Sequence, residues 1–328
     1  MADRATLVTV ARAAGVSRQT VSNVLNSPEL VSPDTLERVR RVIDEQGYRA
    51  NRAARQMRTR RAQVIGLRIE AVRDGSNGVV LERFLHALTA SAEHHDQRTM
   101  LFTATDDESE IRAYRDLEAS AGVDAFVLSG THHGDVRTHW LRERGLPFVT
   151  FGRPWGAEDT HPWVDVDGAA GTAAATEHLL RRGHRRIAFV GWPDGSGVGD
   201  DRRAGWRRTL RAAGLPPGPD AAEPDSFDGG HRAAAELLAP SDPPTAFVCA
   251  SDSLALGLTA ELRRRGIPWD AVIGFDDTPT AGFVGLSSVR QPVADAAAAC
   301  VRQLQTVLDG GVPEPDLLSP ELVVRHPD

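Results

Sequence analysis

Polar and aromatic residues follow several short apolar runs in residues 62–328, and they could form a binding site. Ligands bind beyond the carboxyl ends of parallel strands, so such residues would gather at one edge of a sheet. Carboxylates, a guanidinium and aromatic faces suit a sugar, whose hydroxyls both donate and accept hydrogen bonds. Each residue taken alone could equally cap a strand end or form a salt bridge. The residues are Arg153, Asp167, Trp192, Ser251, Asp252, Asp276 and Asp277.

No motif in this sequence has the spacing of a known catalytic, cofactor-binding or metal-binding site. The loop PDGSGVGDD at 193–201 has GxGxG spacing, which fits neither a dinucleotide fingerprint nor a P-loop, and the chain has no lysine. No GxSxG or HExxH motif is present. The adjacent pairs His94-His95 and His132-His133 lack helical i, i+4 spacing, so surface histidines are expected there. We therefore expect no enzyme, no cofactor and no metal site.

The first 49 residues have the pattern of a helix-turn-helix. Thr6 is a candidate cap for a helix over 7–14 that ends at Gly15, and Ser17 is a candidate cap for a second helix over 18–26. The second helix has a polar face that contains Arg18, Gln19, Ser22 and Asn23, residue types that can bond to base edges. A third helix is predicted from Ser32-Pro33 to Gly47. The pattern favours DNA binding, although a three-helix bundle without DNA would look similar.

Charge is distributed unevenly along the chain. The net charge is -7 overall, but residues 1–61 carry +6 and the remainder therefore carries -13. Cationic side chains neutralise phosphates and supply most of the non-specific affinity for DNA. The basic segment could thus hold a polyanion while the acidic remainder stays away from it. A basic face that is merely solvated is the alternative.

Strands alternate with helical stretches from Ala62 onward, which predicts parallel sheets. Nine runs suit two neighbouring lobes better than one small sheet. Cys249 and Cys300 form no CxxC pair, and neither a signal segment nor a membrane-length apolar stretch is evident, so we expect a cytoplasmic protein without a membrane partner. The runs are VIGLRIE, TMLFTA, AFVLSG, PFVTFG, WVDVD, RIAFVG, AFVCAS, AVIGF and SSVRQ.

Residues 6–58 resemble the DNA-binding head of the lactose-repressor/galactose-repressor (LacI/GalR) family, through TLVTVARAAGVSRQTVSNVLN and VSPDTLERVRRVIDEQGYRANRAARQMR. The resemblance implies that Arg18, Gln19 and Asn23 contact bases, although the family commonly has arginine at position 23. It also implies a hinge helix at 50–61 whose Met57 wedges into the minor groove of operator DNA. A solvent-exposed methionine in a tether is the alternative. The expected DNA contacts are Thr6, Ser17, Arg18, Gln19, Thr20, Ser22, Asn23, Asn26, Asn51, Arg52, Arg55 and Met57.

The remainder resembles the same family through FGRP at 151–154, residues 164–191 and 200–215, ASDSLALG at 250–257 and GFDD at 274–277. By this resemblance Arg202 and Asp276 bind the effector, and Phe227 stacks on a sugar. The family usually has asparagine where this chain has Ser251 and Gly168, so the resemblance does not identify the sugar.

The expected fold is an N-terminal all-α helix-turn-helix head (1–49), a hinge (50–61) and an α/β body (62–328) of two Rossmann-like lobes, similar to periplasmic binding proteins. The lobes are expected over 62–160 plus 290–312, and 161–289 plus 313–328. The expected function is a homodimeric repressor of carbohydrate genes that binds a pseudo-palindromic operator and is released by a mono- or oligosaccharide. A sugar-binding transport protein with a degenerate head and a Rossmann-type oxidoreductase are the alternatives.

Overall fold

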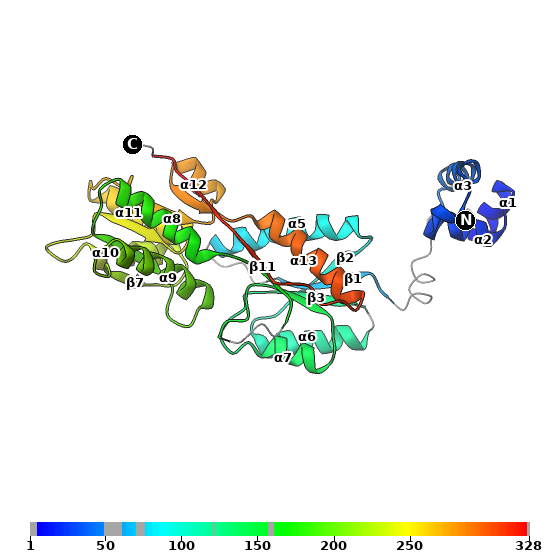
Figure 1. The fold of residues 1–328 in the computed structure, drawn as a ribbon, viewed down its shortest axis with the longest axis horizontal. Coiled ribbons are helices and arrows are strands. Elements are labelled where there is room, and N and C mark those ends of the chain that lie inside the picture. The colour runs from blue at the N-terminus through cyan, green and yellow to red at the C-terminus, as the bar shows by residue number, and fades with distance from the viewer. Residues whose placement is uncertain (1–4, 49–60, 70–75, 121, 157–160, 327–328) are drawn as a thin grey trace. The chain divides into compact units, whose positions relative to one another are not determined.

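A computed structural model describes residues 5–48, 61–69, 76–120, 122–156 and 161–326 of the chain. The chain divides into two compact units, residues 1–62 and 63–328 (Figure 1). The hinge residues Asn51, Arg52, Arg55 and Met57 lie outside the described residues, so the hinge helix stays a prediction. No helix in the described part of the chain has the length and apolar character needed to cross a membrane.

The first unit contains the three expected helices, and side chains cap the N-termini of the first two. Thr6 caps the first helix in a reciprocal capping box with Thr9, and Gly15 ends that helix with φ 66°. The backbone N–H of Thr20 donates to Ser17 Oγ at 3.0 Å, which caps the second helix. The elements are α1 (Leu7–Ala14), α2 (Arg18–Asn26), the short 3₁₀ helix η1 (Pro28–Leu30) and α3 (Pro33–Glu45).

The core of the first unit is small and is shared by all three helices. Val10, Val21 and Val39 have no exposed surface, and Tyr48 packs with them. Leu25 lies four positions after Val21 in α2, but it is 37% exposed. The polar face of α2 is therefore flanked by an exposed apolar residue.

The first lobe of the second unit contains a parallel sheet in the order β11-β5-β4-β3-β1-β2. Helices α5 and α13 pack together on one face, and α6 and α7 cover the other (Figure 1). The elements are β1 (Val64–Ile69), α5 (Ser76–His94), β2 (Arg98–Thr103), α6 (Asp107–Ala119), β3 (Ala125–Ser129), α7 (Val136–Glu143), β4 (Phe148–Phe151), β5 (Trp163–Val166), α13 (Val293–Leu308) and β11 (Asp316–Leu318).

The second lobe contains a sheet in the order β12-β10-β9-β8-β6-β7, parallel except that β12 is antiparallel to β10. Helix α8 packs against α9, and α10 packs against α11. The elements are α8 (Gly168–Arg181), β6 (Ile187–Gly191), α9 (Gly197–Ala212), β7 (Asp220–Ala222), α10 (Phe227–Leu237), β8 (Ala246–Cys249), α11 (Asp252–Arg264), β9 (Val272–Phe275), α12 (Pro279–Val284), β10 (Ser287–Arg290) and β12 (Glu321–Val323).

The two-lobed α/β fold agrees with the prediction, but two expected lobe limits were wrong. The run WVDVD, assigned to the second lobe, forms β5 of the first sheet, where Phe151 of β4 pairs with Val164. Residues 316–318, also assigned to the second lobe, pair with β5 as β11. The chain passes between the sheets after Val166, Arg290 and Leu318. The expected second lobe, 161–289 plus 313–328, took in β5 and β11, although both strands complete the first sheet.

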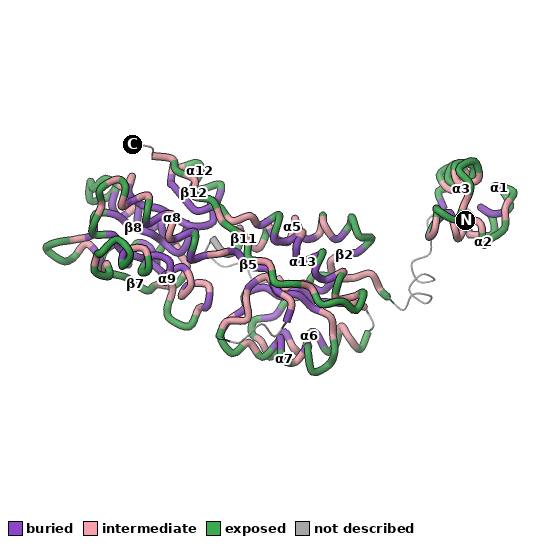
Figure 2. The backbone as a smooth tube through the Cα atoms, viewed as in Figure 1, coloured by how far each residue is buried: buried purple, intermediate pink, exposed green. Residues whose placement is uncertain are grey.

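Both sheets form the buried interior of their lobes, with helices partly exposed outside them (Figure 2). All nine expected strands are present, whereas β7, β11 and β12 were not anticipated because each spans only three residues. Cys249 and Cys300 are buried free thiols, and burial raises the pKa of both. They are therefore inert core residues.

Candidate DNA-reading helix and effector site

Helix α2 presents the predicted base-reading side chains on one accessible face. Arg18 and Gln19 are exposed, and Asn23 is half-buried. Gln19 Nε2 donates to Asn23 Oδ1 at 2.9 Å, so the two amides are held together. Paired amides still offer an oxygen and N–H groups to a base, and adenine is the base that glutamine and asparagine bond in a bidentate way.

The other predicted DNA contacts of the head are two helix-capping residues and three residues of α2. Thr6 and Ser17 accept hydrogen bonds at the N-termini of α1 and α2, where backbone N–H groups and the helix dipole favour phosphate. Thr20 and Ser22 are half-buried, and Asn26 is the last residue of α2. These positions suit backbone contacts better than base reading.

Arg202 of α9 is the centre of a polar cluster in the second lobe. Its side chain is 6% exposed and donates through Nη1 to the backbone carbonyl of Ala250. The guanidinium carbon lies 3.7 Å from the centre of the Phe275 ring and 5.2 Å from that of Trp192. Arg202 Nη1 also lies 3.8 Å from Asp276 Oδ1. Burial is the main cause of the lowered pKa of Arg202, and the nearby carboxylates oppose it.

Three polar atoms of this cluster are buried without a hydrogen-bond partner. They are Arg202 Nε, Trp192 Nε1 and Asp276 Oδ2. Leaving such a group unsatisfied costs about 1–3 kcal/mol, and native proteins contain few of them. Together the three atoms offer two hydrogen-bond donors and one acceptor at the Arg202 guanidinium. This arrangement suits a small ligand with several hydroxyls.

Asp276 lies in a strained turn after β9. It has a positive φ of 112°, and its backbone N–H donates to the carbonyl of Val289 at 2.7 Å. Its Oδ1 accepts from Gln291 Nε2 at 2.7 Å. Burial raises the pKa of Asp276 well above its usual range although Arg202 opposes the shift. Strain of this kind costs about 1–3 kcal/mol and often occurs at ligand sites.

Arg153 connects the two lobes at the edge of the cluster. Its Nε donates to Asp165 Oδ2 of the first lobe at 2.7 Å, and its Nη2 donates to Asp201 Oδ2 of the second lobe at 3.0 Å. Asp201 Oδ2 also accepts from the backbone N–H of Ala169 at 2.9 Å. Arg83 of α5 forms another inter-lobe contact, donating to the carbonyl of Asp277 at 3.2 Å. The salt-bridge alternative therefore applies to Arg153, and the bridge joins the two lobes.

The other predicted strand-end residues have different surroundings. Ser251 is fully buried, caps α11 and donates to Asp225. Asp167 caps α8 by accepting from Ala170 N at 2.8 Å. Phe227 is 51% exposed at the first position of α10. Ser251 thus lies near the cluster, whereas Asp167 mainly supports a helix.

Asp252 has a structural set of partners. Its Oδ2 accepts from Thr278 N at 2.7 Å and from Thr278 Oγ1 at 2.8 Å, and its Oδ1 accepts from Ser288 Oγ at 2.6 Å. Burial is the largest cause that raises the pKa of Asp252 to about 6. The carboxyl joins α11 to the turn after β9 and to β10, so direct contact with an effector is not supported.

Sequence reasoning missed Asp165, Asp201 and Asp225. Asp165 lies inside the WVDV run, where an acidic residue looked like part of a strand. Asp201 directly precedes Arg202 inside α9, so its position does not mark it as a strand-end residue. Asp225 follows the unanticipated strand β7, so no strand end marked it. If residues 220–222 are counted as a strand, Asp225 becomes a strand-end candidate for the binding site.

Comparison with known proteins agrees with this architecture. Residues 6–51 match "Bacterial regulatory proteins, lacI family", and residues 176–326 match "Periplasmic binding protein-like domain". The HTH-type transcriptional regulator CelR of Thermobifida fusca is 35% identical over 336 residues, covering 98% of both chains.

Two solved structures are similar over most of the chain. A regulatory protein of LacI family from Chloroflexus aggregans is 38% identical with a TM-score of 0.76, covering 80% of this chain and 98% of its own. A transcriptional regulator CelR-cellobiose complex is 30% identical with a TM-score of 0.73, covering 98% of this chain and 99% of its own. The chain therefore belongs to the lacI family of bacterial regulatory proteins.

Proposed function

We propose that the protein is a homodimeric repressor of carbohydrate genes, released from its operator when a mono- or oligosaccharide binds the Arg202 cluster. Each head would place α2 in the major groove of one half-site, as helix-turn-helix dimers do. The exposed Arg18 and the Gln19–Asn23 pair would read bases. Binding to the chromosome would place the protein in the bacterial cytoplasm. The function consists of binding events and requires no chemical step.

The observation that carries the effector proposal is the set of unsatisfied buried atoms on Arg202, Trp192 and Asp276. A sugar hydroxyl can accept from Arg202 Nε or Trp192 Nε1 and donate to Asp276 Oδ2. Filling these positions would recover the cost of leaving them unpaired. Phe227, half exposed after Asp225, remains available to stack on the apolar face of a sugar ring.

The inter-lobe contacts would link sugar binding in the body to DNA binding by the head. Arg153 binds Asp201, the residue next to Arg202, so a sugar at Arg202 would alter the pairing that joins the lobes. Because effector and operator affinities are thermodynamically linked, operator DNA would weaken sugar binding by the same factor. The hinge at 50–61 would transmit the change to the paired heads.

Isothermal titration calorimetry with a sugar panel tests the effector proposal. Cellobiose comes first because the CelR structure is a cellobiose complex, and glucose, galactose and maltose complete the panel. We expect one sugar to bind the full chain, and we expect Arg202→Met to weaken it at least tenfold, the loss of about one charged hydrogen bond. Sugar binding that is unchanged in Arg202→Met would contradict the proposed site. Circular dichroism of the variant checks that it is folded.

A further inference from the structure

The charged groups around the Arg202 cluster are unbalanced, and the imbalance bears on which sugars the site can accept. Four carboxyl groups act on the Arg202 guanidinium, and a fifth, that of Asp252, acts on one of the four. Three arginines lie with these five carboxyl groups in the described part of the chain, namely Arg202, Arg153 and Arg83. Negative groups therefore outnumber positive ones among the described residues of the site. The four carboxyl groups are those of Asp276, Asp225, Asp165 and Asp201.

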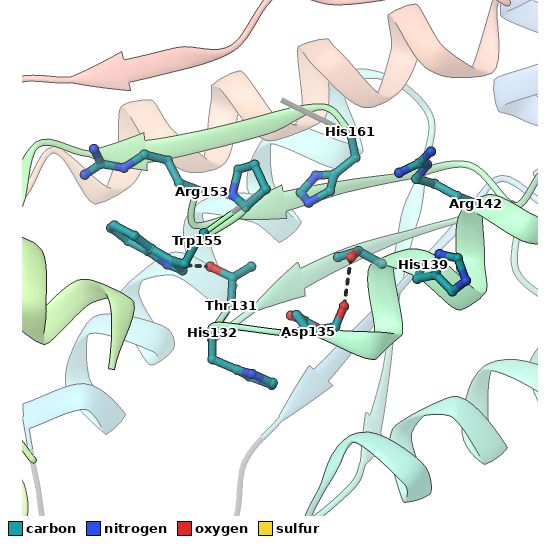
Figure 3. A pocket seen from close by; sticks show the side chains of 12 residues that line it. Thr131, His132, Asp135, His139, Arg142, Arg153, Trp155 and His161 are labelled. Atoms are coloured by element: carbon teal, nitrogen blue, oxygen red, sulfur yellow. Dashed lines mark hydrogen bonds between the residues drawn. The ribbon is translucent and has the colours of Figure 1, made fainter. Parts of the chain in front are cut away.

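Each of the three arginines is already matched by other groups of the protein. Arg153 binds two carboxylates, and its guanidinium carbon lies 4.7 Å from the centre of the Trp155 ring (Figure 3). Arg83 donates through both terminal nitrogens to the carbonyl of Asp277 at 3.2 Å. Arg202 keeps an unpaired Nε, but four carboxyl groups share its charge. Because arginine and lysine are the usual partners of carboxylate and phosphate, and the chain has no lysine, an acidic sugar would add negative charge where it already prevails.

Asp276 is the group that a positively charged ligand would bind. The residue is 1% exposed, and its Oδ1 accepts from Gln291, whereas its Oδ2 has no hydrogen-bond partner in the described part of the chain. An ammonium group offers three N–H donors and a full positive charge. It would also stabilise the ionised form of a carboxyl group that burial disfavours. An amine would therefore use Oδ2 better than the hydroxyl of a neutral sugar.

This inference rests on the proposed effector function and adds the charge of the ligand to it. We propose that the effector site selects sugars by charge: it prefers an amino sugar, whose ammonium group replaces one hydroxyl, and it excludes sugar acids and sugar phosphates. The ammonium would bind Asp276 Oδ2, while hydroxyls of the same sugar accept from Arg202 Nε and Trp192 Nε1. The surrounding carboxyl groups offset the Arg202 charge, so a second cation is admitted beside it.

Calorimetry on the full chain at pH 7, below the ordinary pKa of an amino group, tests the proposal. The parent is the neutral sugar that binds most tightly, and the probes are its 2-amino-2-deoxy and 6-amino-6-deoxy derivatives, the N-acetyl forms of both, its uronic acid and its 6-phosphate. We expect one amino derivative to bind at least about fivefold more tightly than the parent, because charge strengthens the hydrogen bond, and N-acetylation should abolish the gain. Both acidic probes should bind at least about tenfold more weakly than the parent, because like charges repel.

Two variants locate the charge effect within the site. Asp276→Asn keeps an oxygen that can accept from Gln291 but carries no charge, so the amino derivative should bind it no more tightly than the parent does. Asp225→Asn keeps an oxygen that can accept from Ser251, and it should reduce both the gain from the amine and the penalty on the acids. Asp228→Asn, at an exposed position of the same lobe, is the matched control and should keep both effects. Circular dichroism checks that each variant is folded.

The outcomes separate this inference from the proposed function on which it rests. A neutral parent that binds while neither amino derivative binds more tightly would overturn the preference for an amine and leave the proposed function intact, as would a gain that persists in Asp276→Asn. Acidic probes that bind as tightly as the parent would overturn the exclusion of anions. If no sugar of any charge bound the full chain, the proposed function and this inference would both be overturned.

Discussion

Replacing Asp252 with asparagine should change how stability depends on pH. The pKa of Asp252 is raised from 3.8 to about 6 in the folded protein, with burial as the largest cause. Between these values the folded protein keeps the proton that the unfolded chain loses, so stability falls as pH rises through this window. At about 1.4 kcal/mol per pKa unit, the fall is about 3 kcal/mol.

Asparagine removes this titration and can keep the geometry. Its oxygen can accept from Thr278 N, and its amide can donate to Ser288 Oγ. We therefore expect the free energy of unfolding of Asp252→Asn, relative to the natural chain, to increase by about 2 kcal/mol between pH 4 and pH 7, since part of the fall occurs below pH 4.

Urea unfolding followed by circular dichroism at four pH values in that range measures this difference. Asp228→Asn, at an exposed position of the same lobe, controls for the loss of a carboxylate. A difference between Asp252→Asn and the natural chain that stays within about 1 kcal/mol at every pH would refute the reasoning.

Two further substitutions test the effector site and the head. Trp192→Phe removes an unpaired buried N–H but keeps a ring beside Arg202, so sugar binding in calorimetry should weaken about five- to tenfold without a loss of stability. A parallel loss of stability in urea would point to a structural role instead. Gln19→Ala should weaken operator binding by about 1–3 kcal/mol and relax the preference at one base pair, as measured by anisotropy with operator variants. Uniform weakening across all variants would show that Gln19 contacts only the backbone.

The head was predictable because its signals are local. Thr6, Ser17 and Gly15 mark helix ends by their own backbone chemistry, and the structure has these ends where the sequence predicted them. Helical periodicity groups Leu25 with Val21, but it does not show how far a small core extends, and Leu25 is 37% exposed. The hinge prediction lies outside the described residues.

The effector cluster was only partly predictable because it is assembled from distant segments. Arg202 lies in α9 and Asp276 follows β9, 74 positions later in the sequence, and only the family resemblance named both residues as effector contacts. Asp252 has the same residue type and a similar strand-end position, yet its lone pairs are taken by Thr278 and Ser288. Only tertiary packing separates a structural carboxylate from a binding one.

The most direct test of the account measures operator affinity by fluorescence anisotropy with and without saturating sugar, in the natural chain and in Arg202→Met. The DNA is the region upstream of the protein's own gene, and the sugar is the one that binds most tightly in calorimetry. We predict that sugar weakens operator binding about tenfold or more in the natural chain, and that Arg202→Met needs at least about tenfold more sugar for the same release. Equal release of both proteins, or sugar binding that leaves operator affinity unchanged, would contradict the account.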